Sequence, residues 1–560
     1  MNKITLGICN DETASACLFK NGELVAAVSE ERFSRKKLDN SFPLKSIEYV
    51  LSFLDSESSQ VEVAYAWTKG FDPKLLETYL KRFSLCETLE EKQILQEKID
   101  SEIDRDTSNK NEFNSWLDGK YSLSHYYHHE AHAASACLLS PYDEGICLTA
   151  DGRGDFESLV VWKFNRNNLS QPLVKIFSAT SADSLGYFYG RITGLLGFAP
   201  MRHEGKITGL AAFGDPYKAL PLMEKMISFK DGDLTSNLGK FYKPFFKPYS
   251  EELVNEISKF SREDIAAAAQ HHLEKILCDI LIHIADINNI SNSNLMLAGG
   301  IFGNVKVTQK LKELSFIDKV FVQPHMGDGG LCVGAAALSQ HQKGVPIQPL
   351  NNVYLGPHVD VNSFESNISK LSQFKIENCL DCYDKICKDL TANNVIGIIR
   401  GRMEYGPRAL CHRSIIYKTS DNSINDSINK RLNRTEFMPF APVIRKEVSD
   451  ISFKNYDDSD ITLQYMTSTI NCSEEFSQKC PAVTHIDQTA RPQIVSKDNN
   501  LFMWELLEKW EKVSGELSLV NTSFNAHEEP IICTYQEALN ALKNNRVDIV
   551  YIENYRVTNK

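Results

Sequence analysis

Apolar runs separated by short polar turns open the chain and predict β-strands. Residues 4–8 and 15–19 are apolar, and Asn21-Gly22 separates the second run from a third at residues 23–28. Asn-Gly between two such runs favours a tight hairpin turn, because both residues tolerate the positive φ angles that this turn requires. The N-terminal segment is therefore predicted to contain three strands, the last two joined as a hairpin.

A comparable pattern recurs at residues 145–177, where the apolar runs ICLTA, SLVVWKF and PLVKIF alternate with polar turns. Two copies of this arrangement favour a duplicated α/β half-domain, although the copies share negligible sequence identity. Apolar residues three or four positions apart predict a helix over residues 264–287, and residues 295–297 read as a buried strand running into Gly299-Gly300. Between the blocks, the charged and mostly helical residues 74–120 are predicted to form a solvated face.

The stretch KGVPIQP at residues 343–349 predicts a linker. Beyond it, residues 395–399 read as a buried strand that begins a second α/β region. We therefore predict an α/β protein of two domains, residues 1–347 and residues 348–560.

The composition is that of an ordinary globular protein and excludes a disordered chain. Among 560 residues, 61 Lys and Arg stand against 73 Asp and Glu, which gives a net charge of −12. This balance argues mildly against a protein that binds phosphate backbones over a broad surface. The chain begins without the apolar region of a signal peptide, and no apolar stretch approaches the ~20 residues that span a bilayer. We expect a cytoplasmic protein that does not associate with membranes.

The fourteen cysteines are scattered along the chain, and we expect reduced thiols. One CxxC pair, Cys379 and Cys382, has Cys387 nearby. Without a second CxxC or a His pair this is a weak zinc signal, and a structural role is favoured.

The stretch HHEAHAASA is the clearest candidate metal site. His128 and His132 are four residues apart, so on a helix both imidazoles leave the same face and can reach one ion. The pattern differs from the zinc-protease motif, which would require His in place of Ala133. The alternative is a His pair that only fills space, and further ligands must come from elsewhere in the chain.

Acidic residues beside glycines follow two apolar runs. Asp151 comes directly after ICLTA, and Asp328 stands in GDGG ahead of a helix of small residues. Such places suit a metal or an anion because the backbone can approach closely, although a simple tight turn is an equally good reading of Asp151. Gly299-Gly300 with Asn304 has the same strand–glycine–helix character, and neither a P-loop nor a Rossmann fingerprint is present.

Cations and amides cluster in the C-terminal region of this acidic chain. Such a cluster suggests a pocket for phosphate or carboxylate, which Arg binds in a bidentate manner, while structural ion pairing is the alternative. The residues are Arg400, Arg402, Arg408, Arg413, Lys430, Arg431, Arg434, Arg491, Asn521, Ser523 and Asn525.

Motifs in a characteristic order cover nearly the whole chain: GELVAAVSEERFSRKKLDNSFP, HHEAHAASA, DGRGDFES, HEGKITGLAAFG, LAGGIFGNVKV, GDGGLCVGAA, GRMEYGPRALCHRS, MPFAPVI, the stretch 485–491 and NTSFN. Together they resemble the O-carbamoyltransferase family, which includes the nodulation-factor, cephamycin and tobramycin carbamoyltransferases. The resemblance implies an actin-like (ASKHA) N-terminal domain similar to Kae1/TsaD proteins, and a C-terminal domain similar to YrdC/Sua5.

The resemblance also implies an activity. Carbamoyl phosphate and ATP, the latter with Mg²⁺, would form carbamoyl-adenylate in the C-terminal domain with loss of pyrophosphate and phosphate. In the N-terminal domain a divalent metal, Fe²⁺ first and Mn²⁺ or Zn²⁺ as alternatives, would lie on His128, His132, Asp151 and Asp328. An acceptor hydroxyl would then take the carbamoyl group and release AMP. We expect a small-molecule acceptor, with a nucleotide or nucleic-acid acceptor as the alternative, and a homodimer is one possible assembly.

By matched motif, Lys206 with Gly299, Gly300 and the residues 327–330, which include Gly329, would hold the adenylate. Carbamoyl phosphate and ATP would be bound by Arg408, Arg413, Arg491 and the loop from Asn521 through Ser523 to Asn525. Lys36 or Lys37 is a further candidate for the anion, with a solvated Lys as an equally good alternative.

The chain departs from the family pattern at two places. Its first turn lacks the family's His, so Asp11 or Glu12 is the candidate general base. An Arg of the family is replaced at Met438, and Arg431 or Arg434 is the candidate substitute. Two alternatives remain: a threonylcarbamoyl-type tRNA-modifying enzyme, since both domains resemble halves of that pathway, and a non-catalytic regulator that binds nucleotide and metal, which the missing His suggests.

Overall fold

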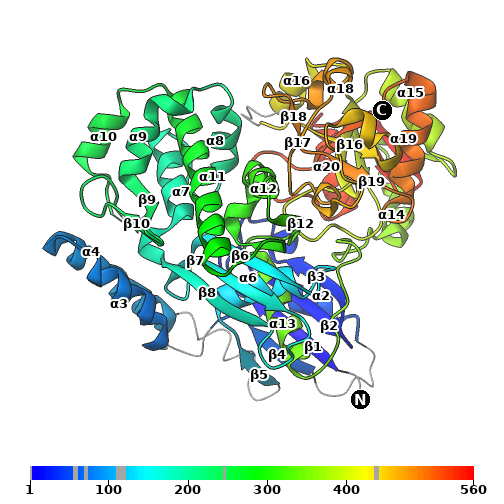
Figure 1. Cartoon of the computed structure of the whole chain (residues 1–560). Helices are drawn as coiled ribbons and strands as arrows, with labels where there is room; N and C mark the ends of the chain where they lie inside the picture. Colours follow the sequence, from blue (N-terminus) through cyan, green and yellow to red (C-terminus); the bar gives the residue numbers. More distant parts are fainter. Residues whose placement is uncertain are drawn as a thin grey trace. The chain divides into compact units, whose positions relative to one another are not determined.

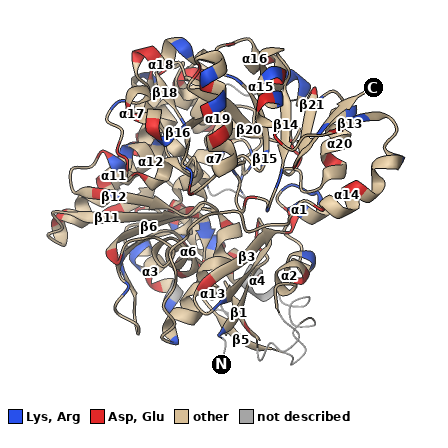
Figure 2. Cartoon of the chain, turned by 90° about the vertical axis from the view of Figure 1, so that its right-hand side faces the viewer, with Lys and Arg blue, Asp and Glu red and all other residues tan. Residues whose placement is uncertain are grey.

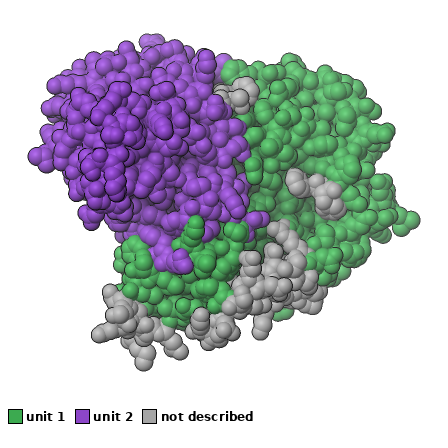
Figure 3. Space-filling model, turned by 180° about the vertical axis from the view of Figure 1, so that it is seen from behind, with its two compact units in different colours: residues 1–25, 41–47, 51–350 green, residues 26–40, 48–50, 351–560 purple. Residues whose placement is uncertain are grey.

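The protein is described here from a computed structural model. Its contacts divide the chain into two compact units, which Figure 3 colours separately. Unit 1 comprises residues 1–25, 41–47 and 51–350, and unit 2 comprises residues 26–40, 48–50 and 351–560. The structure describes residues 3–54, 61–67, 73–108, 116, 121–243, 247–433 and 440–560.

Unit 2 takes up part of the N-terminal region, whereas the two domains predicted from the sequence are continuous segments. The reason lies in contacts made by the segment around helix α1 (Glu31–Ser34). The backbone amide of Ala27 donates to the carbonyl of Leu355 at 3.2 Å, and Nη2 of Arg32 donates to the carbonyl of Gly406 at 2.9 Å. Both contacts join residues far apart in the sequence, so no local pattern could reveal them.

The first sheet of unit 1 contains the predicted N-terminal strands. Asn21 and Gly22 have φ angles of 53° and 86°, so the predicted hairpin turn between the second and third strands is confirmed. The first two strands are antiparallel, and two later strands continue the sheet in parallel with β1. The strand order is β3-β2-β1-β4-β5, with β1 (Ile4–Cys9), β2 (Ser15–Lys20), β3 (Glu23–Ser29), β4 (Val61–Tyr65) and β5 (Ser122–His125).

The second sheet repeats this plan. Three strands in sequence are antiparallel, and two later strands are parallel to the first of them. Two copies of one strand order confirm the predicted duplication and give unit 1 the actin-like (ASKHA) architecture. The order is β12-β11-β6-β7-β8, with β6 (Glu144–Gly154), β7 (Glu157–Asn165), β8 (Leu173–Thr180), β11 (Ser293–Ala298) and β12 (Ile317–Val322).

Two helices made of small residues connect the sheets (Figure 1). Helix α6 (His128–Cys137) contacts β6 and β11, while α13 (Leu331–Gln342) contacts β1, β2 and β4, and the helices contact each other. Their approach is close, because a Cβ added to Gly334 would lie 1.8 Å from the carbonyl oxygen of Ala131. Glycine at this crossing is therefore a packing requirement.

Helix α4 (Leu89–Ser108) corrects the prediction that residues 74–120 form a solvated face. Ile94, Leu95 and Ile99 belong to the hydrophobic core of unit 1. Lys98 and Glu102 are also buried, with exposed fractions of 3% and 5%. They lie one helical turn apart and pair at 2.7 Å, which offsets the cost of taking both charges out of water. The charged residues on the outer face obscured this inward face in the sequence.

Unit 1 contains further helices and two short strands. They are α2 (Leu44–Leu51), whose residues 48–50 group with unit 2, α3 (Glu77–Ser84), α7 (Leu185–Leu195), α8 (Glu204–Ala211), α9 (Pro216–Met226), α10 (Glu251–Ile257), α11 (Arg262–Ile287) and α12 (Val305–Lys312), with the short strands β9 (Ile227–Lys230) and β10 (Asp233–Ser236). The predicted helix over residues 264–287 is confirmed as α11, and the predicted strand over residues 295–297 as part of β11.

Unit 2 is built on one mixed sheet with its own hydrophobic core. The buried strand predicted at residues 395–399 is confirmed as β14. That its fold is of the YrdC/Sua5 type stays a prediction. The order is β13-β22-β21-β14-β15-β20-β16-β19, with β13 (Phe374–Asn378), β14 (Ile396–Ile399), β15 (Arg413–Lys418), β16 (Ala441–Arg445), β19 (Gln493–Val495), β20 (Ser518–Ser523), β21 (Ile549–Ile552) and β22 (Tyr555–Asn559).

Acidic and basic residues are interspersed along the helices of unit 2 (Figure 2). These helices include α14 (Val361–Asn367), α15 (Tyr383–Thr391), α16 (Ile424–Arg431), α17 (Ser449–Ser452), α18 (Glu474–Lys479), α19 (Leu501–Ser514) and α20 (Tyr535–Lys543), and the short strands β17 (Ile470–Asn471) and β18 (Thr489–Ala490) form a separate pair. Within the part of the chain that the structure describes, no helix has the length and apolar character needed to cross a bilayer.

The crossing of α6 and α13 leads to a test of stability. Gly334→Ala forces a side chain against the backbone of α6, and we expect it to cost about 1–3 kcal/mol of the free energy of unfolding, measured by urea denaturation. Gly205→Ala in α8 is the matched control, because no atom lies within 4 Å of its added carbon, and it should be neutral or stabilising. Equal effects of the two substitutions would contradict this account of the crossing.

Candidate metal centre and arginine site

Helix α6 presents His128 and His132 from one face, one turn apart, and both side chains are fully buried. The start of this helix is held by Asp155, whose carboxylate accepts a hydrogen bond from the backbone amide of His128. Gly154 lets strand β6 pass beside the helix, because a Cβ there would lie 2.2 Å from Cδ2 of His128. The glycines and acid of the DGRGD stretch thus fix where the first imidazole lies.

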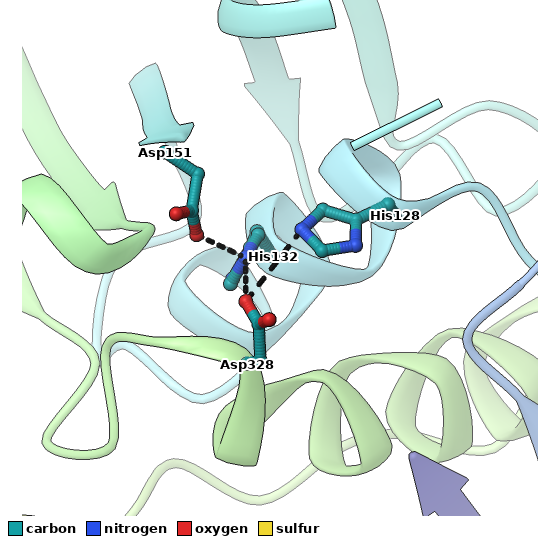
Figure 4. Close-up of side chains that lie close together, drawn as sticks. All are labelled: His128, His132, Asp151 and Asp328. Atoms are coloured by element: carbon teal, nitrogen blue, oxygen red, sulfur yellow. Dashed lines mark ion pairs between the residues drawn. The ribbon is translucent and has the colours of Figure 1, made fainter. Parts of the chain in front are cut away.

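Two carboxylates from other elements meet these imidazoles (Figure 4). Asp151 lies in β6, and Asp328 begins the 3-10 turn Asp328–Gly330 ahead of α13. Nε2 of His132 is 3.2 Å from Asp151 Oδ2 and 3.6 Å from Asp328 Oδ1, and Nε2 of His128 is 3.7 Å from Asp328 Oδ1. All four ligand atoms lie within 4.8 Å of one another, which is the arrangement expected around a single ion.

Burial and the neighbouring charges shift the pKa values of the residues in this cluster. Burial, with the neighbouring His132 and His129, holds the pKa of His128 well below its usual value. Burial alone would also lower the pKa of His132, but the carboxylates of Asp151 and Asp328 outweigh it and raise that pKa to about 9. Burial and the charge of Asp151 raise the pKa of Asp328 well above its usual range. The imidazole of His132 lowers the pKa of Asp151, so the negative charge of the cluster is paired with its histidines.

These residues fit a divalent transition metal. Both ring nitrogens of His128 are buried and have no hydrogen-bond partner among the described residues, and the same holds for Nδ1 of His132, so the described part of the chain leaves these atoms available. Two imidazoles and two carboxylates suit Fe²⁺, Mn²⁺ or Zn²⁺. The ligand types alone do not select among these ions.

Asp11 and Glu12, the candidate general bases, lie in the turn after β1. Asp11 is 7% exposed, and burial, opposed by Arg153 and reinforced by Asp151, raises its pKa to about 6. Glu12 is more exposed at the surface. Desolvation by the surrounding chain and the charges of Asp11 and Asp151 raise the pKa of Glu12 to about 7. Of the two, Asp11 is the more enclosed beside the metal ligands.

The glycine segments of unit 1 bring its strands together. Gly299 has a φ of +106°, and a Cβ there would lie 2.2 Å from the carbonyl of Ala150. The amide of Gly300 donates to Asp151 Oδ2 at 3.0 Å, so it orients a metal ligand. The carbonyl of Gly329 accepts a hydrogen bond from Ser15 Oγ at 2.8 Å.

Two other candidate binding residues of unit 1, Asn304 and Lys206, belong to the starts of helices α12 and α8. Asn304 caps α12, and its amide exchanges hydrogen bonds with Gln270 at 2.8 and 3.2 Å, so its side chain supports the fold. Lys206 lies in α8 with its side chain buried, and its Nζ is 5.8 Å from the centroid of the Phe198 ring.

In unit 2, the guanidinium group of Arg413 is surrounded by backbone carbonyl groups. It is fully buried, and its three guanidinium nitrogens donate to backbone carbonyl groups. Because each nitrogen is used in this way, the geometry favours a role in shaping the loop rather than the predicted role in binding an anion. The acceptors are Arg400 at 2.6 Å, His412 at 3.0 Å, Pro357 at 3.1 Å, Gly401 at 3.3 Å and Cys533 at 3.4 Å.

Glu404, which sequence reasoning did not single out, fixes the same loop. Its Oε1 accepts hydrogen bonds from the backbone amides of Leu410, His412 and Arg413 at 2.7, 2.8 and 3.1 Å. The loop between them carries Arg408. The available sequence signal was a single acid within a basic stretch. Its partners are backbone amides, and because every residue except proline has one, the sequence does not identify them.

Arg408 and Arg491 form the remaining candidate anion site. Burial, together with the like charge of Arg491, lowers the pKa of Arg408 well below its usual value. Two neighbouring guanidinium groups in such surroundings are the electrostatic complement of a phosphate. Arg431 instead pairs with Asp548 at 2.8 Å, and Arg434 lies outside the described residues.

The other predicted residues of unit 2 have the following places. Asn521 is buried in β20 and donates to Gln493 Oε1 at 2.7 Å. The amide of Asn525 donates to the carbonyls of Ala526 and Glu529 at 2.9 and 2.8 Å, which is a loop-stabilising arrangement. Ser523 ends β20, and Lys37 is half-buried in the turn after α1.

Comparison with known proteins bears on the reaction. The family model described as "Carbamoyltransferase N-terminus" matches residues 5–337, and the one described as "Carbamoyltransferase C-terminus" matches residues 387–559. The chain belongs to the carbamoyltransferase family. This enzyme is therefore a carbamoyltransferase, as the sequence motifs predicted.

Two relatives match along most of their length. An uncharacterized protein of Methanocaldococcus jannaschii is 32% identical to this carbamoyltransferase over 99% of each chain. Nodulation protein NolNO of Sinorhizobium fredii is 31% identical over 97% of this chain and 78% of its own. Among solved structures, component A of (R)-2-hydroxyglutaryl-CoA dehydratase from Acidaminococcus fermentans is 15% identical with a TM-score of 0.35, over 61% of this chain and 98% of that one.

The metal cluster leads to a binding test on the full-length carbamoyltransferase. Loss of even an outer-shell partner costs about 10–100-fold in metal affinity, so His128→Ala and Asp328→Asn should each weaken Fe²⁺ or Co²⁺ binding at least about tenfold. Equilibrium dialysis with elemental analysis measures the bound ion.

His129→Gln is the matched control for this test. His129 is the next buried residue of α6, but its Nδ1 lies 3.0 Å from Thr149 Oγ1, away from the ligand cluster. Metal content that falls equally in all three variants, or in none, would contradict the assignment of the ligands.

Proposed function

We propose that this carbamoyltransferase forms carbamoyl-adenylate from carbamoyl phosphate and MgATP in unit 2, and transfers the carbamoyl group to an acceptor hydroxyl at the metal centre of unit 1. The observation that carries the proposal is the convergence of His128, His132, Asp151 and Asp328 beside the buried carboxyl group of Asp11. This convergence supports a site that combines candidate ligands for a cation with a candidate base.

Unit 2 supplies the cations that activation requires. Carbamoyl phosphate and ATP both carry phosphate groups, which repel each other unless their charge is offset. Arg408 and Arg491 provide two adjacent positive charges, and their mutual repulsion is relieved when an anion lies between them. Water cleaves phosphate from carbamoyl phosphate, and an oxygen of the resulting carbamate attacks the α-phosphate of ATP, whose bond to pyrophosphate breaks. The net change consumes one water molecule and gives carbamoyl-adenylate, pyrophosphate and phosphate. The role of these arginines is to position and neutralise the reacting groups.

In unit 1 the acceptor oxygen attacks the carbamoyl carbon. A new carbon–oxygen bond forms, the bond to the adenylate phosphate breaks, and AMP leaves with its electron pair. Asp11 is placed to take the proton of the acceptor hydroxyl, in line with its enclosed carboxylate. A divalent cation bound by the four ligands would polarise the carbamoyl carbonyl and offset phosphate charge. We propose a small hydroxylated molecule as the acceptor, with a nucleotide as the alternative, and mass spectrometry of carbamoyl adducts across hydroxylated metabolites and nucleotides separates them.

The arginine site is tested by the first half-reaction. A hydrogen bond to a charged group contributes about 1.5–3 kcal/mol, so Arg408→Ala should lower kcat/KM for carbamoyl phosphate by about 10–100-fold. Carbamoyl-phosphate-dependent release of pyrophosphate from ATP is the measurement. Lys479→Ala removes a surface cation that pairs with Glu475, and should leave the rate unchanged. Normal pyrophosphate release in Arg408→Ala would rule out the role assigned to this residue.

The general base is tested by the second half-reaction. Asp11→Asn cannot accept a proton, and general-base catalysis contributes about 10²–10⁴-fold, so carbamoyl transfer should fall at least about 10²-fold while pyrophosphate release stays unchanged. Glu12→Gln is the comparison, because Glu12 is the neighbouring and more exposed carboxylate. A larger loss of transfer in Glu12→Gln than in Asp11→Asn would assign the role to Glu12 instead.

A further inference from the structure

Arg153 lies two residues after the metal ligand Asp151, and the proposed function gives it no task. Its side chain is only 17% exposed, and Nη1 donates to Glu102 Oε2 at 2.9 Å. Glu102 is its one ion-pair partner among the described residues. Nε and Nη2 make no hydrogen bond with the described part of the chain, so this guanidinium group retains donors while being largely withdrawn from water.

The carboxylate of Glu102 is shared between two cations. Lys98 Nζ lies 2.7 Å from Glu102 Oε1, and Ser181 Oγ donates to the same oxygen at 2.8 Å. Burial would raise the pKa of Glu102, but Lys98 and Arg153 outweigh it and lower that pKa. The buried group of Lys98, Glu102 and Arg153 therefore contains two positive charges and one negative charge. One carboxylate therefore serves two cations within this group.

Arg153 lies on the Asp11 side of the metal centre. Asp11 and Glu12 both stabilise the charged form of Arg153, yet neither comes within the 4 Å of an ion pair with it. The backbone beside it is constrained, because a Cβ on Gly152 would lie 3.0 Å from the ring of Tyr187. Arg153 is thus held near the reacting groups by its anchor Glu102 and by the turn that also carries Asp151.

We propose that Arg153 is a further catalytic residue, which binds the phosphate group of the carbamoyl donor at the metal centre through its remaining N–H donors. The inference rests on the proposed function. The centre itself is rich in carboxylates, which repel a phosphate, and a guanidinium group offers two parallel donors that match phosphate oxygens. When the carbamoyl carbon–oxygen bond breaks, the electron pair stays on the phosphate oxygen, and Arg153 offsets the added negative charge.

Helix α4 helps to position Arg153. Its Glu102 anchors Arg153 from one side, and its Lys98 lies with Nζ 5.5 Å from the centroid of the Tyr187 ring. An anchor of this kind reduces the entropy lost when the guanidinium group binds its anion. Glu102 is therefore a positioning residue for the donor phosphate.

The test uses the full chain loaded with Co²⁺, whose visible absorption reports on ligands at the metal centre and not on the arginine site of unit 2. AMP, the leaving group, is titrated and its dissociation constant is read from the spectral change. We expect Arg153→Gln to raise this constant about 10–100-fold and Arg153→Lys to restore part of the affinity. Glu102→Gln should raise it to a smaller extent. Lys163→Gln, an exposed cation of β7, is the control with wild-type affinity.

Two further arms distinguish the outcomes. Bound cobalt per chain shows whether a variant still folds and holds the ion, and adenosine, which lacks the phosphate, should give the same response in wild type and Arg153→Gln. Unchanged AMP affinity in Arg153→Gln overturns the inference. A cobalt spectrum of the wild-type protein that does not change when AMP is added also overturns it. An adenosine affinity that falls together with AMP affinity shows a loss of the base or ribose site and also overturns it. A wild-type chain that binds no cobalt overturns the proposed function itself.

Discussion

The candidate metal centre depends on the close approach of α6 and α13. Gly334 of α13 lies against the backbone of Ala131 in α6, and a single added carbon would push the helices apart. The imidazoles belong to α6, while Asp328 stands just ahead of α13. A wider crossing would therefore move the carboxylate away from both histidines. Packing between two helices of small residues brings together candidate ligands from opposite halves of a duplicated domain.

The two candidate sites gather charges of opposite sign. In unit 1, the carboxylates of Asp151 and Asp328 meet two buried imidazoles, an arrangement that suits a cation. In unit 2, burial and the like charge of Arg491 lower the pKa of Arg408, an arrangement that suits an anion. Such arrangements cost stability, so they are retained where a ligand offsets them. The net charge of −12 describes the whole chain and says nothing of these local clusters of charge.

Buried ionic groups also build the scaffold around both sites. Glu404 gathers three backbone amides and Arg413 gathers backbone carbonyls, so that the loop carrying Arg408 is defined from both sides. In unit 1 the shared carboxylate of Glu102 holds Arg153 beside the metal ligands. A buried charge with several hydrogen bonds favours one geometry, because other arrangements lose those bonds. Arginines and acids therefore have different roles in this protein. Some stabilise loops through hydrogen bonds to the backbone, and others are candidates for ligand binding.

Local pattern was sufficient to predict the hairpin at Asn21-Gly22, the repeated strand blocks and the pairing of His128 with His132 on one helical face. These features depend on residues close in sequence, where turn geometry and helical periodicity act. The motifs also predicted Asp151 and Asp328 as partners, through resemblance rather than through spacing. The sequence could not predict that Arg413 donates to backbone carbonyls whereas Arg408 lies near Arg491. It also could not predict that charged residues of α4 are buried. Those outcomes depend on backbone groups and side chains brought together from distant segments, and a residue's type does not reveal which long-range partner will satisfy its charge.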